Sequence, residues 1–275
     1  GDVYKRQGID IAYSVSTDSS GNVIVAGYYS SGTLNIFAAN GTTVSFTLSN
    51  SGINDVFVVK YDSSGTPLWA RKMAGTGDDI ARSVSTDSSG NIIVTGSYYA
   101  SNPLNIFAAD GTTVSFTLSN SGSYNSFVVK YNSSGTPLWA RRIGGTASDV
   151  SYSVSTDSSG NIVVAGLYTS NPVNIFAANG STVSFTLSNS GSNDSFVVKY
   201  DSSGTPLWAR RLAGTNNDIA YSVSTDLSGN IVVAGEYDSN PLNIFAADGS
   251  TVSFTLSNSG SNDAFVVKYD SSGTP

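Results

Sequence analysis

A glutamate and a neighbouring aspartate form a pair of carboxylates that could serve as general acid and base. Glu236 and Asp238 stand at i and i+2, so an extended strand would present both on one side. Paired carboxylates hydrolyse glycosidic bonds when suitably separated. The chain has no histidine or cysteine, which excludes a histidine base, a cysteine nucleophile and a zinc site. A calcium-dependent polysaccharide hydrolase or lyase is therefore an alternative function. The simpler interpretation is that the two carboxylates are solvated on the surface and have no catalytic role.

Four aspartates recur at one position of the sequence, immediately before an expected strand. A ring of such carboxylates could bind a hard cation such as Ca²⁺ through oxygen ligands. The favoured interpretation is that each aspartate accepts backbone N–H bonds in its own loop, so that no cofactor is needed. The four candidates are Asp10, Asp79, Asp149 and Asp218.

Tyrosines lie close to the same strand ends and supply a second kind of candidate site. Aromatic rings beside asparagine and aspartate could stack on sugars, and they could equally cover apolar hairpins, which is the interpretation we favour. These ligand-binding candidates are Tyr28, Tyr29, Tyr98, Tyr99, Tyr168 and Tyr237.

The net charge and the hydropathy of the chain limit the classes of partner that it could bind. The 275 residues carry a net charge of −7, which argues against nucleic acid and against an anionic membrane surface. No apolar run approaches the roughly 20 residues that a membrane helix needs, so membrane insertion is not expected. The partner that remains is an unidentified protein or glycan.

The elements that must position these residues are repeated. The string Ser-Val-Ser-Thr-Asp begins at four places, and Thr-Pro-Leu-Trp-Ala-Arg recurs at the same spacing, which is 69 or 70 residues. The copies span about 8–74, 75–143, 144–213 and 214–275, the last of them incomplete. Residues 1–7 match nothing in the repeat and resemble one reading frame of a sequencing adapter, so we treat them as an artefact. A secretion signal, an anchor or further copies could lie beyond both ends.

One copy consists of short strands and turns. In the second copy, strands are expected over 81–87, 92–96, 127–131 and 138–143, with a hairpin inserted over 104–118. The Asn-Gly or Asp-Gly pair at each hairpin tip predicts a type I′ turn. The aspartates that open the Asp-x-x-Gly turns are expected to form turns and not to bind calcium; they are Asp18, Asp87, Asp157 and Asp226.

These elements predict an all-β fold, a β-propeller of four-stranded antiparallel blades, each with an inserted β-hairpin between the second and third strands. The recurring tryptophan is expected to pack between blades, and the Arg/Lys pairs, such as Arg141-Arg142, to protect an exposed sheet edge. A stacked β-solenoid is the competing architecture. Four copies could close into a ring, although an arc of a larger ring is slightly favoured.

The repeat resembles that of a known family. Phe-Val-Val-Lys-Tyr-Asp-Ser-Ser-Gly-Thr-Pro-Leu-Trp-Ala-Arg, followed by Ala-Gly-Thr, Asp-Ile-Ala and Ser-Val-Ser-Thr-Asp-Ser-Ser-Gly-Asn, is similar to the bacterial SBBP-type β-propeller repeat. The resemblance covers nearly all of residues 8–275 apart from the hairpins. It implies a bacterial protein that is secreted or exposed at the cell surface, and it supplies no catalytic residues.

Together these observations predict a non-enzymatic, extracellular binding or scaffold module that recognises a protein or a glycan through the face bearing the hairpins. A purely structural surface repeat is the other alternative.

Overall fold

The computed structural model describes residues 8–275, which form 23 strands and no helix. The proposed artefact at residues 1–7 lies outside the described residues. Within 8–275, no segment forms a helix of the length and apolar character that crossing a membrane requires.

The strands follow the sequence repeat. The first copy forms β1 (Asp10–Thr17), β2 (Val23–Tyr29), β3 (Thr33–Phe37), β4 (Val44–Ser49), β5 (Asp55–Tyr61) and β6 (Pro67–Ala74). The second forms β7 (Asp78–Thr86), β8 (Ile92–Tyr99), β9 (Leu104–Phe107), β10 (Val114–Leu118), β11 (Tyr124–Tyr131) and β12 (Pro137–Gly144). The third forms β13 (Asp149–Thr156), β14 (Ile162–Tyr168), β15 (Val173–Phe176), β16 (Val183–Leu187), β17 (Asp194–Tyr200) and β18 (Pro206–Ala213). The fourth forms β19 (Asp218–Thr225), β20 (Ile231–Tyr237), β21 (Leu242–Phe245), β22 (Val252–Leu256) and β23 (Asp263–Tyr269).

Each hairpin after the first belongs to the sheet of the preceding copy, whereas β3 and β4 form a two-stranded sheet of their own. The first sheet has the order β1-β2-β5-β6-β9-β10, in which four strands of the first copy are followed by the hairpin of the second. The link is short: Met73 pairs with Ile106, and Ala74 pairs with Asn105. The next two sheets repeat this order. The expected blade of four strands, with a hairpin attached to its own copy, is therefore replaced by a six-stranded sheet built from two copies.

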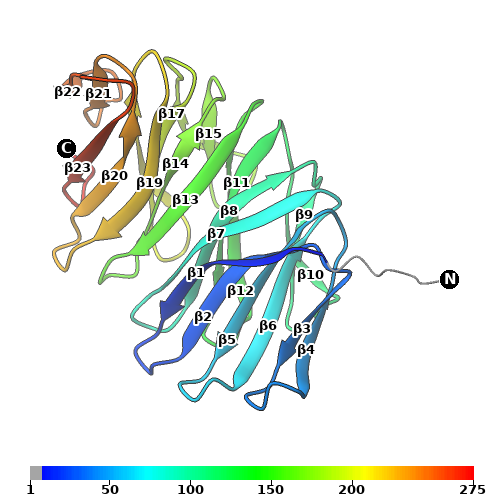
Figure 1. Cartoon of the computed structure of the whole chain (residues 1–275). Helices are drawn as coiled ribbons and strands as arrows, with labels where there is room; N and C mark the ends of the chain where they lie inside the picture. Colours follow the sequence, from blue (N-terminus) through cyan, green and yellow to red (C-terminus); the bar gives the residue numbers. More distant parts are fainter. Residues whose placement is uncertain (1–7) are drawn as a thin grey trace.

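The sheets follow one another in an open, propeller-like row. The inner strands β1, β7, β13 and β19 contact one another in that order. The first sheet (blue) and the last sheet (orange to red) lie at opposite ends of the row, so the four copies do not close into a ring (Figure 1).

The Asp-x-x-Gly turns form as the sequence predicts. Asp18 accepts hydrogen bonds from the backbone N–H groups of Ser20 and Asn22, each at 3.0 Å, and Gly21 takes φ = 76°.

The hairpin tips differ from the prediction. A type I′ turn needs positive φ at two residues, but only the glycine, such as Gly41 at 71°, has it. The preceding Asn40 instead accepts the N–H groups of Thr42 and Thr43 through its side chain.

Consecutive copies are joined by donors of the outer strand and by carbonyls of a turn in the next copy. Trp139 Nε1 donates to Ser202 O at 3.2 Å, and Arg141 donates from Nε to Gly204 O at 2.7 Å. Gly204 takes φ = 80°, and a Cβ there would lie 2.8 Å from the Trp139 ring, so only glycine fits.

The tryptophan packs between copies as predicted. The edge-protecting role expected of the Arg/Lys pairs is wrong for the first member of each pair: Arg141 is 7% exposed because its guanidinium is covered by the next copy, whereas Arg142 is half-buried.

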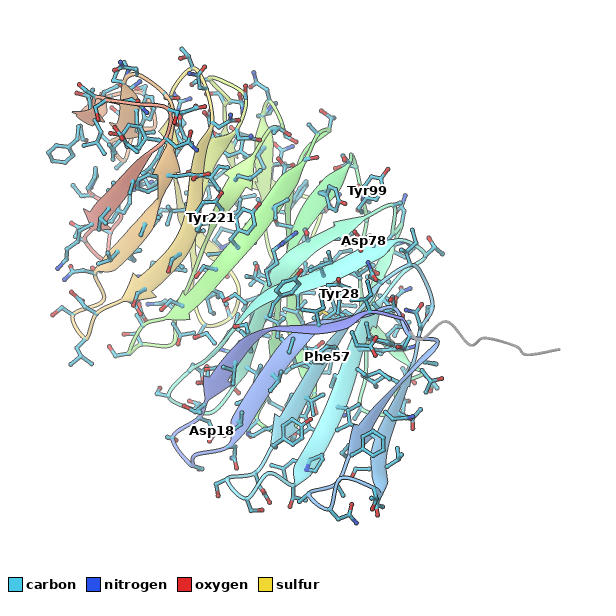
Figure 2. All side chains as sticks on the ribbon, viewed as in Figure 1. Asp18, Tyr28, Phe57, Asp78, Tyr99 and Tyr221 are labelled. Atoms are coloured by element: carbon cyan, nitrogen blue, oxygen red, sulfur yellow. The ribbon has the colours of Figure 1, made fainter. Side chains whose placement is uncertain are left out.

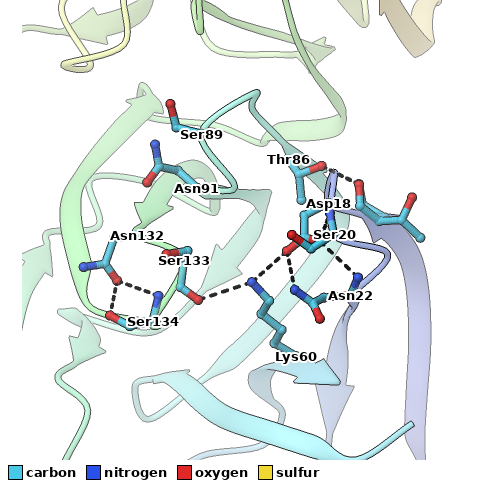
Figure 3. A network of polar contacts seen from close by, with 12 residues as sticks. Asp18, Ser20, Asn22, Lys60, Thr86, Ser89, Asn91, Asn132, Ser133 and Ser134 are labelled. Atoms are coloured by element: carbon cyan, nitrogen blue, oxygen red, sulfur yellow. Dashed lines mark hydrogen bonds and ion pairs between the residues drawn. The ribbon is translucent and has the colours of Figure 1, made fainter. Parts of the chain in front are cut away.

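A buried lysine reaches the same turn. Lys60 Nζ lies 2.9 Å from Asp18 Oδ2 in its own copy and 3.3 Å from Ser133 O in the next (Figure 3). Lys130 repeats both contacts with Asp87 and Ser202. The fourth copy has only the ion pair: Lys268 lies 3.2 Å from Asp226, and its side chain is 59% exposed, against 3% for Lys130. Burial of the pair therefore depends on the neighbouring copy.

These two lysines allow a matched test of the junction. Replacing one member of a buried ion pair leaves an uncompensated charge, so Lys130→Met is expected to lower the free energy of unfolding by about 3–5 kcal/mol. Lys268→Met removes an exposed pair and is expected to cost about 0–1 kcal/mol. Urea denaturation followed by circular dichroism gives both values, and equal costs would contradict the structure of the junction.

Candidate functional site

The four aspartates predicted as metal ligands do not surround an open channel. Asp79, Asp149 and Asp218 are fully buried between copies. Asp149 Oδ2 accepts the N–H of Gly145 and the hydroxyl of Ser170, each at 2.7 Å, so the carboxylate closes its own loop. Asp10 accepts the hydroxyl of Ser31 at 2.7 Å in the same way, although it is exposed among the residues that the structure describes. The geometry therefore matches the interpretation in which each aspartate accepts hydrogen bonds within its own loop. The ring of carboxylates around a channel is wrong, because the buried carboxylates are enclosed in separate junctions.

Sequence reasoning missed a second carboxylate at two of these junctions. The start of β5 runs parallel to the start of β7, and Asp79 N donates to Asn54 O at 2.9 Å. Asp55 thereby comes beside Asp79, and both side chains are fully buried. Asp194 and Asp218 are brought together in the same way at the third junction. The second junction has Asn125 in place of the first carboxylate.

Burial makes these groups retain protons. It raises the pKa of Asp79 to about 7, and the nearby charge of Asp55 adds to the effect. Burial likewise raises the pKa of Asp55 to about 6 and that of Asp194 to about 7. The Oδ1 atoms of these three residues have no hydrogen-bond partner among residues 8–275. Within the same range, no three acidic side chains come close enough to ligate one metal ion. The expectation that the chain needs no cofactor stays a prediction, with Ca²⁺ as its alternative.

Four of the six predicted sugar-binding tyrosines are in the interior. Tyr29, Tyr98, Tyr168 and Tyr237 are at most 5% exposed. Each donates its hydroxyl to a backbone carbonyl at the end of the hairpin of its own copy, as Tyr168 does to Ser188 O at 2.8 Å. These rings cover the apolar hairpins, so a sugar-binding role for them is wrong.

Tyr28 and Tyr99 are the accessible members of that set. The ring of Tyr28 lies 5.8 Å from that of Tyr13, and the ring of Tyr99 stacks on Tyr124 at 4.8 Å. The Tyr124 hydroxyl lies 3.4 Å from Asp78. Both pairs are partly exposed aromatic surfaces, located in the first and second copies respectively (Figure 2).

The proposed catalytic carboxylates are engaged by different partners. Glu236 Oε1 accepts the hydroxyl of Tyr221 at 2.8 Å. Asp238 lies beyond the end of β20 and accepts the backbone N–H of Asn217. The first carboxylate is thus held over an inner strand and the second in the loop between copies, which is not the arrangement of an acid and a base that flank one bond.

A row of larger side chains runs along the otherwise small residues of the inner strands. Each inner strand has a β-bulge at its centre, and the bulged residue has no partner in the sheet. These residues, here called the bulge ladder, are Tyr13, Arg82, Tyr152 and Tyr221. The Arg82 guanidinium lies 5.2 Å from the Tyr152 ring centre, and the rings of Tyr152 and Tyr221 are 5.3 Å apart.

The bulge ladder is accessible. Tyr13 is 49% and Tyr221 is 45% exposed, and Tyr221 lies on the side of the molecule that carries the inner strands (Figure 2). Aligning the copies shows this position as Tyr, Arg, Tyr, Tyr between small residues. A large side chain at one fixed position between small residues is the sequence signal from which the ladder could have been predicted. The ladder offers rings, one guanidinium and the Glu236 carboxylate to a ligand.

Comparison with known proteins changes the expected family. No protein-family model matches the sequence. An uncharacterized WD repeat-containing protein of Acanthamoeba polyphaga mimivirus is 31% identical over 297 aligned residues. The match takes in 96% of this chain and 21% of the viral protein, so the chain spans about a fifth of that relative's length. The prediction that the chain belongs to the bacterial SBBP-type family is therefore wrong. The prediction of a bacterial, secreted protein rested on that family and is no longer supported. An extracellular location stays a prediction.

Solved structures with some likeness to the chain include a propeller domain and a chain of a coat assembly. The WD40 β-propeller domain of Doa1 is 13% identical, with 81% of this chain and 75% of that chain covered and a TM-score of 0.27. A chain of the COPII outer coat vertex on membranes is 14% identical, with 93% and 66% covered and a TM-score of 0.32. TM-scores this low do not establish a shared overall fold.

The buried carboxylate pairs predict how stability depends on pH. Their pKa values in the folded chain, about 6 and 7, exceed the unfolded value of about 4. The folded state therefore binds more protons, and stability falls as pH rises from about 4 to about 7. Asp55→Asn together with Asp194→Asn, which copies Asn125, is expected to flatten this fall and to stabilise the chain at pH 8 by about 1–3 kcal/mol per pair.

Urea midpoints measured across that pH range test this expectation. Asp263→Asn, at the equivalent position of the fourth copy where no neighbouring carboxylate packs, is the matched control and should keep the parent profile. A double variant with an unchanged slope would show that the paired carboxylates are not the titrating groups.

Proposed function

We propose that this chain is a non-enzymatic scaffold that binds a protein partner through the bulge ladder. The observation that carries the proposal is the partly exposed row of Arg82, Tyr152 and Tyr221, whose side chains stack on one another along the inner strands. Tyrosine and arginine are both enriched at protein interfaces. Tyrosine offers a large contact area at low cost in side-chain entropy, and arginine adds charge and several hydrogen-bond donors. The WD-repeat relative supports this proposal, since WD-repeat propellers typically act as protein-interaction scaffolds.

The hairpin-bearing face is a second surface on which a partner could bind. One strand of each hairpin after the first pairs with the preceding copy, so only the outer strand is free. A valine at the start of that strand recurs half-exposed in every copy: Val44, Val114, Val183 and Val252. We favour the ladder because its side chains already contact one another and present both charge and rings, whereas the hairpins offer isolated apolar residues.

The ladder can be tested against the hairpins with peptides selected on the intact chain by phage display. Tyr152→Ser with Tyr221→Ser is expected to weaken binding of the selected peptides by about tenfold or more, because the rings supply the contact area. Val114→Ser with Val183→Ser is the matched control on the hairpin face and should leave affinity unchanged. Loss of binding in the hairpin variant alone would reject the ladder as the site.

Two further measurements test whether the chain instead binds a glycan or acts as an enzyme. A glycan array probed with the parent chain is expected to stay blank, and so is a hydrolysis screen on polysaccharides with Glu236→Gln as its control. Cleavage that is lost in Glu236→Gln would replace the scaffold with an enzyme.

A further inference from the structure

Residues that break the repeat gather at one place in the second copy, with the first and third copies on either side. Tyr99 and Ala100 stand where the other copies have a single residue, and Tyr124 stands where they have asparagine. Asp78 pairs with Tyr99, and Tyr99 pairs with Tyr124, so the three residues share one end of the sheet (Figure 2). Ala100 is the one non-glycine residue of 8–275 with a positive φ, at 56°. The second copy therefore has a local structure that the repeat itself does not require.

Asp78 places a carboxylate beside two aromatic rings. Its Oδ1 atom accepts the side-chain amide of Asn54 from the first copy, and its Oδ2 atom lies 3.4 Å from the Tyr124 hydroxyl. The rings of Tyr99 and Tyr124 stack at 4.8 Å, and Tyr99 is 41% exposed. No lysine or arginine of residues 8–275 forms an ion pair with Asp78. A carboxylate beside aromatic faces can bind an ammonium or guanidinium group through an ion pair and a cation–π contact.

Arg82 supplies the opposite charge on the same strand. It replaces the tyrosine of the other three copies on the bulge ladder, and it is the only lysine or arginine on the four inner strands. Its guanidinium lies 5.2 Å from the centre of the Tyr152 ring. The residue is half-buried, and its Nε atom has no hydrogen-bond partner in the part of the chain that the structure describes. A guanidinium that rests on a ring can still offer its planar edge to a carboxylate through two parallel hydrogen bonds.

The two opposite charges lie near each other without forming a pair. Burial and the charge of Asp78 raise the pKa of the Tyr124 hydroxyl, whereas the charge of Arg82 lowers it, so both charges are close to that ring. Asp78 and Arg82 are four positions apart on β7, which corresponds to about 13 Å in an extended strand. No ion pair within residues 8–275 joins them or involves either one. Each charge is thus available to a group of opposite charge on a ligand.

We infer that the partner of the bulge ladder is a peptide segment with one basic and one acidic side chain, which bind Asp78 and Arg82 respectively. The basic group would lie against the rings of Tyr99 and Tyr124, and the acidic group would accept the edge of the guanidinium that rests on Tyr152. The argument is charge complementarity, which fixes the orientation and register of a partner. An extended segment that follows β7 would carry its two charges about four residues apart. This inference rests on the proposed function, because it specifies the partner that the ladder binds.

The other copies supply variants that keep the fold. Arg82→Tyr restores the residue that the ladder has in the first, third and fourth copies. Asp78→Asn introduces the residue of the fourth copy, Asn217, whose side-chain oxygen accepts the amide of Asn193 at 2.6 Å. Asparagine at position 78 can accept the amide of Asn54 in the same way. Each variant therefore removes one charge and leaves the contacts between copies in place.

Random peptides of about ten residues, displayed on phage and selected separately on the parent chain and on the two variants, test the inference. Peptides selected on the parent chain are expected to carry an acidic and a basic residue at a fixed spacing. Selection on Arg82→Tyr is expected to lose the acidic residue, and selection on Asp78→Asn is expected to lose the basic one. A parent selection without such charge pairs, or the same charge content in all three selections, overturns the inference.

A synthetic copy of one peptide selected on the parent chain, with and without its acidic residue, measures the contact directly. Replacing that residue by alanine is expected to weaken binding to the parent chain by about tenfold and to have no effect on binding to Arg82→Tyr. Tyr152→Ser with Tyr221→Ser separates this inference from the proposed function. A peptide that loses affinity only in that double variant rejects the inference and leaves the ladder as the binding site. A peptide whose binding survives all three variants rejects the proposed function as well.

Discussion

The structure depends on how one row of turn carbonyls is satisfied. The turn between the last two strands of a complete copy, such as that between β17 and β18, points its carbonyls at the preceding copy, where burial without a partner would be costly. At the second junction, Lys130, Trp139 and Arg141 meet three consecutive carbonyls, of Ser202, Ser203 and Gly204. The donors therefore come from one copy and the acceptors from the next. This direction gives the row of sheets a forward and a back face.

Neighbour dependence explains why identical residues behave differently along the chain. The same lysine is buried in three copies and exposed in the fourth, and the same valine of the inner strand is buried in three copies and exposed in the first. The carboxylate pairs follow the same logic, since Asp55 and Asp79 come from different copies and meet only at their junction. Stability in such an array is a sum of copies and of the interfaces between them. The bulge ladder also crosses these junctions, so any ligand that binds several of its residues would bind several copies at once.

Much of the fold could be predicted from the sequence because the signals are local. The repeat period, the strands and the Asp-x-x-Gly turns follow from residue types that act within a few positions, as Asp18 does on Ser20 and Asn22. The sheet to which a hairpin belongs could not be predicted, because copies of nearly identical sequence give the same pattern whether β9 pairs within its copy or with β6. The tyrosines were misjudged for a related reason: Tyr168 is buried because its hydroxyl reaches Ser188 O, a contact that spans 20 residues. The partnership of Asp55 with Asp79 likewise arises only where two copies meet.

Amide hydrogen exchange, resolved by residue at low chain concentration, tests the pairing between copies most directly. Strands β3 and β9 share the sequence Leu-Asn-Ile-Phe, but β9 pairs with the outer strand of the preceding copy, whereas within residues 8–275 β3 pairs only with β4. The account predicts that Asn105 and Ile106 exchange more slowly than Asn35 and Ile36 by about tenfold or more. Equal exchange in the two hairpins would contradict it.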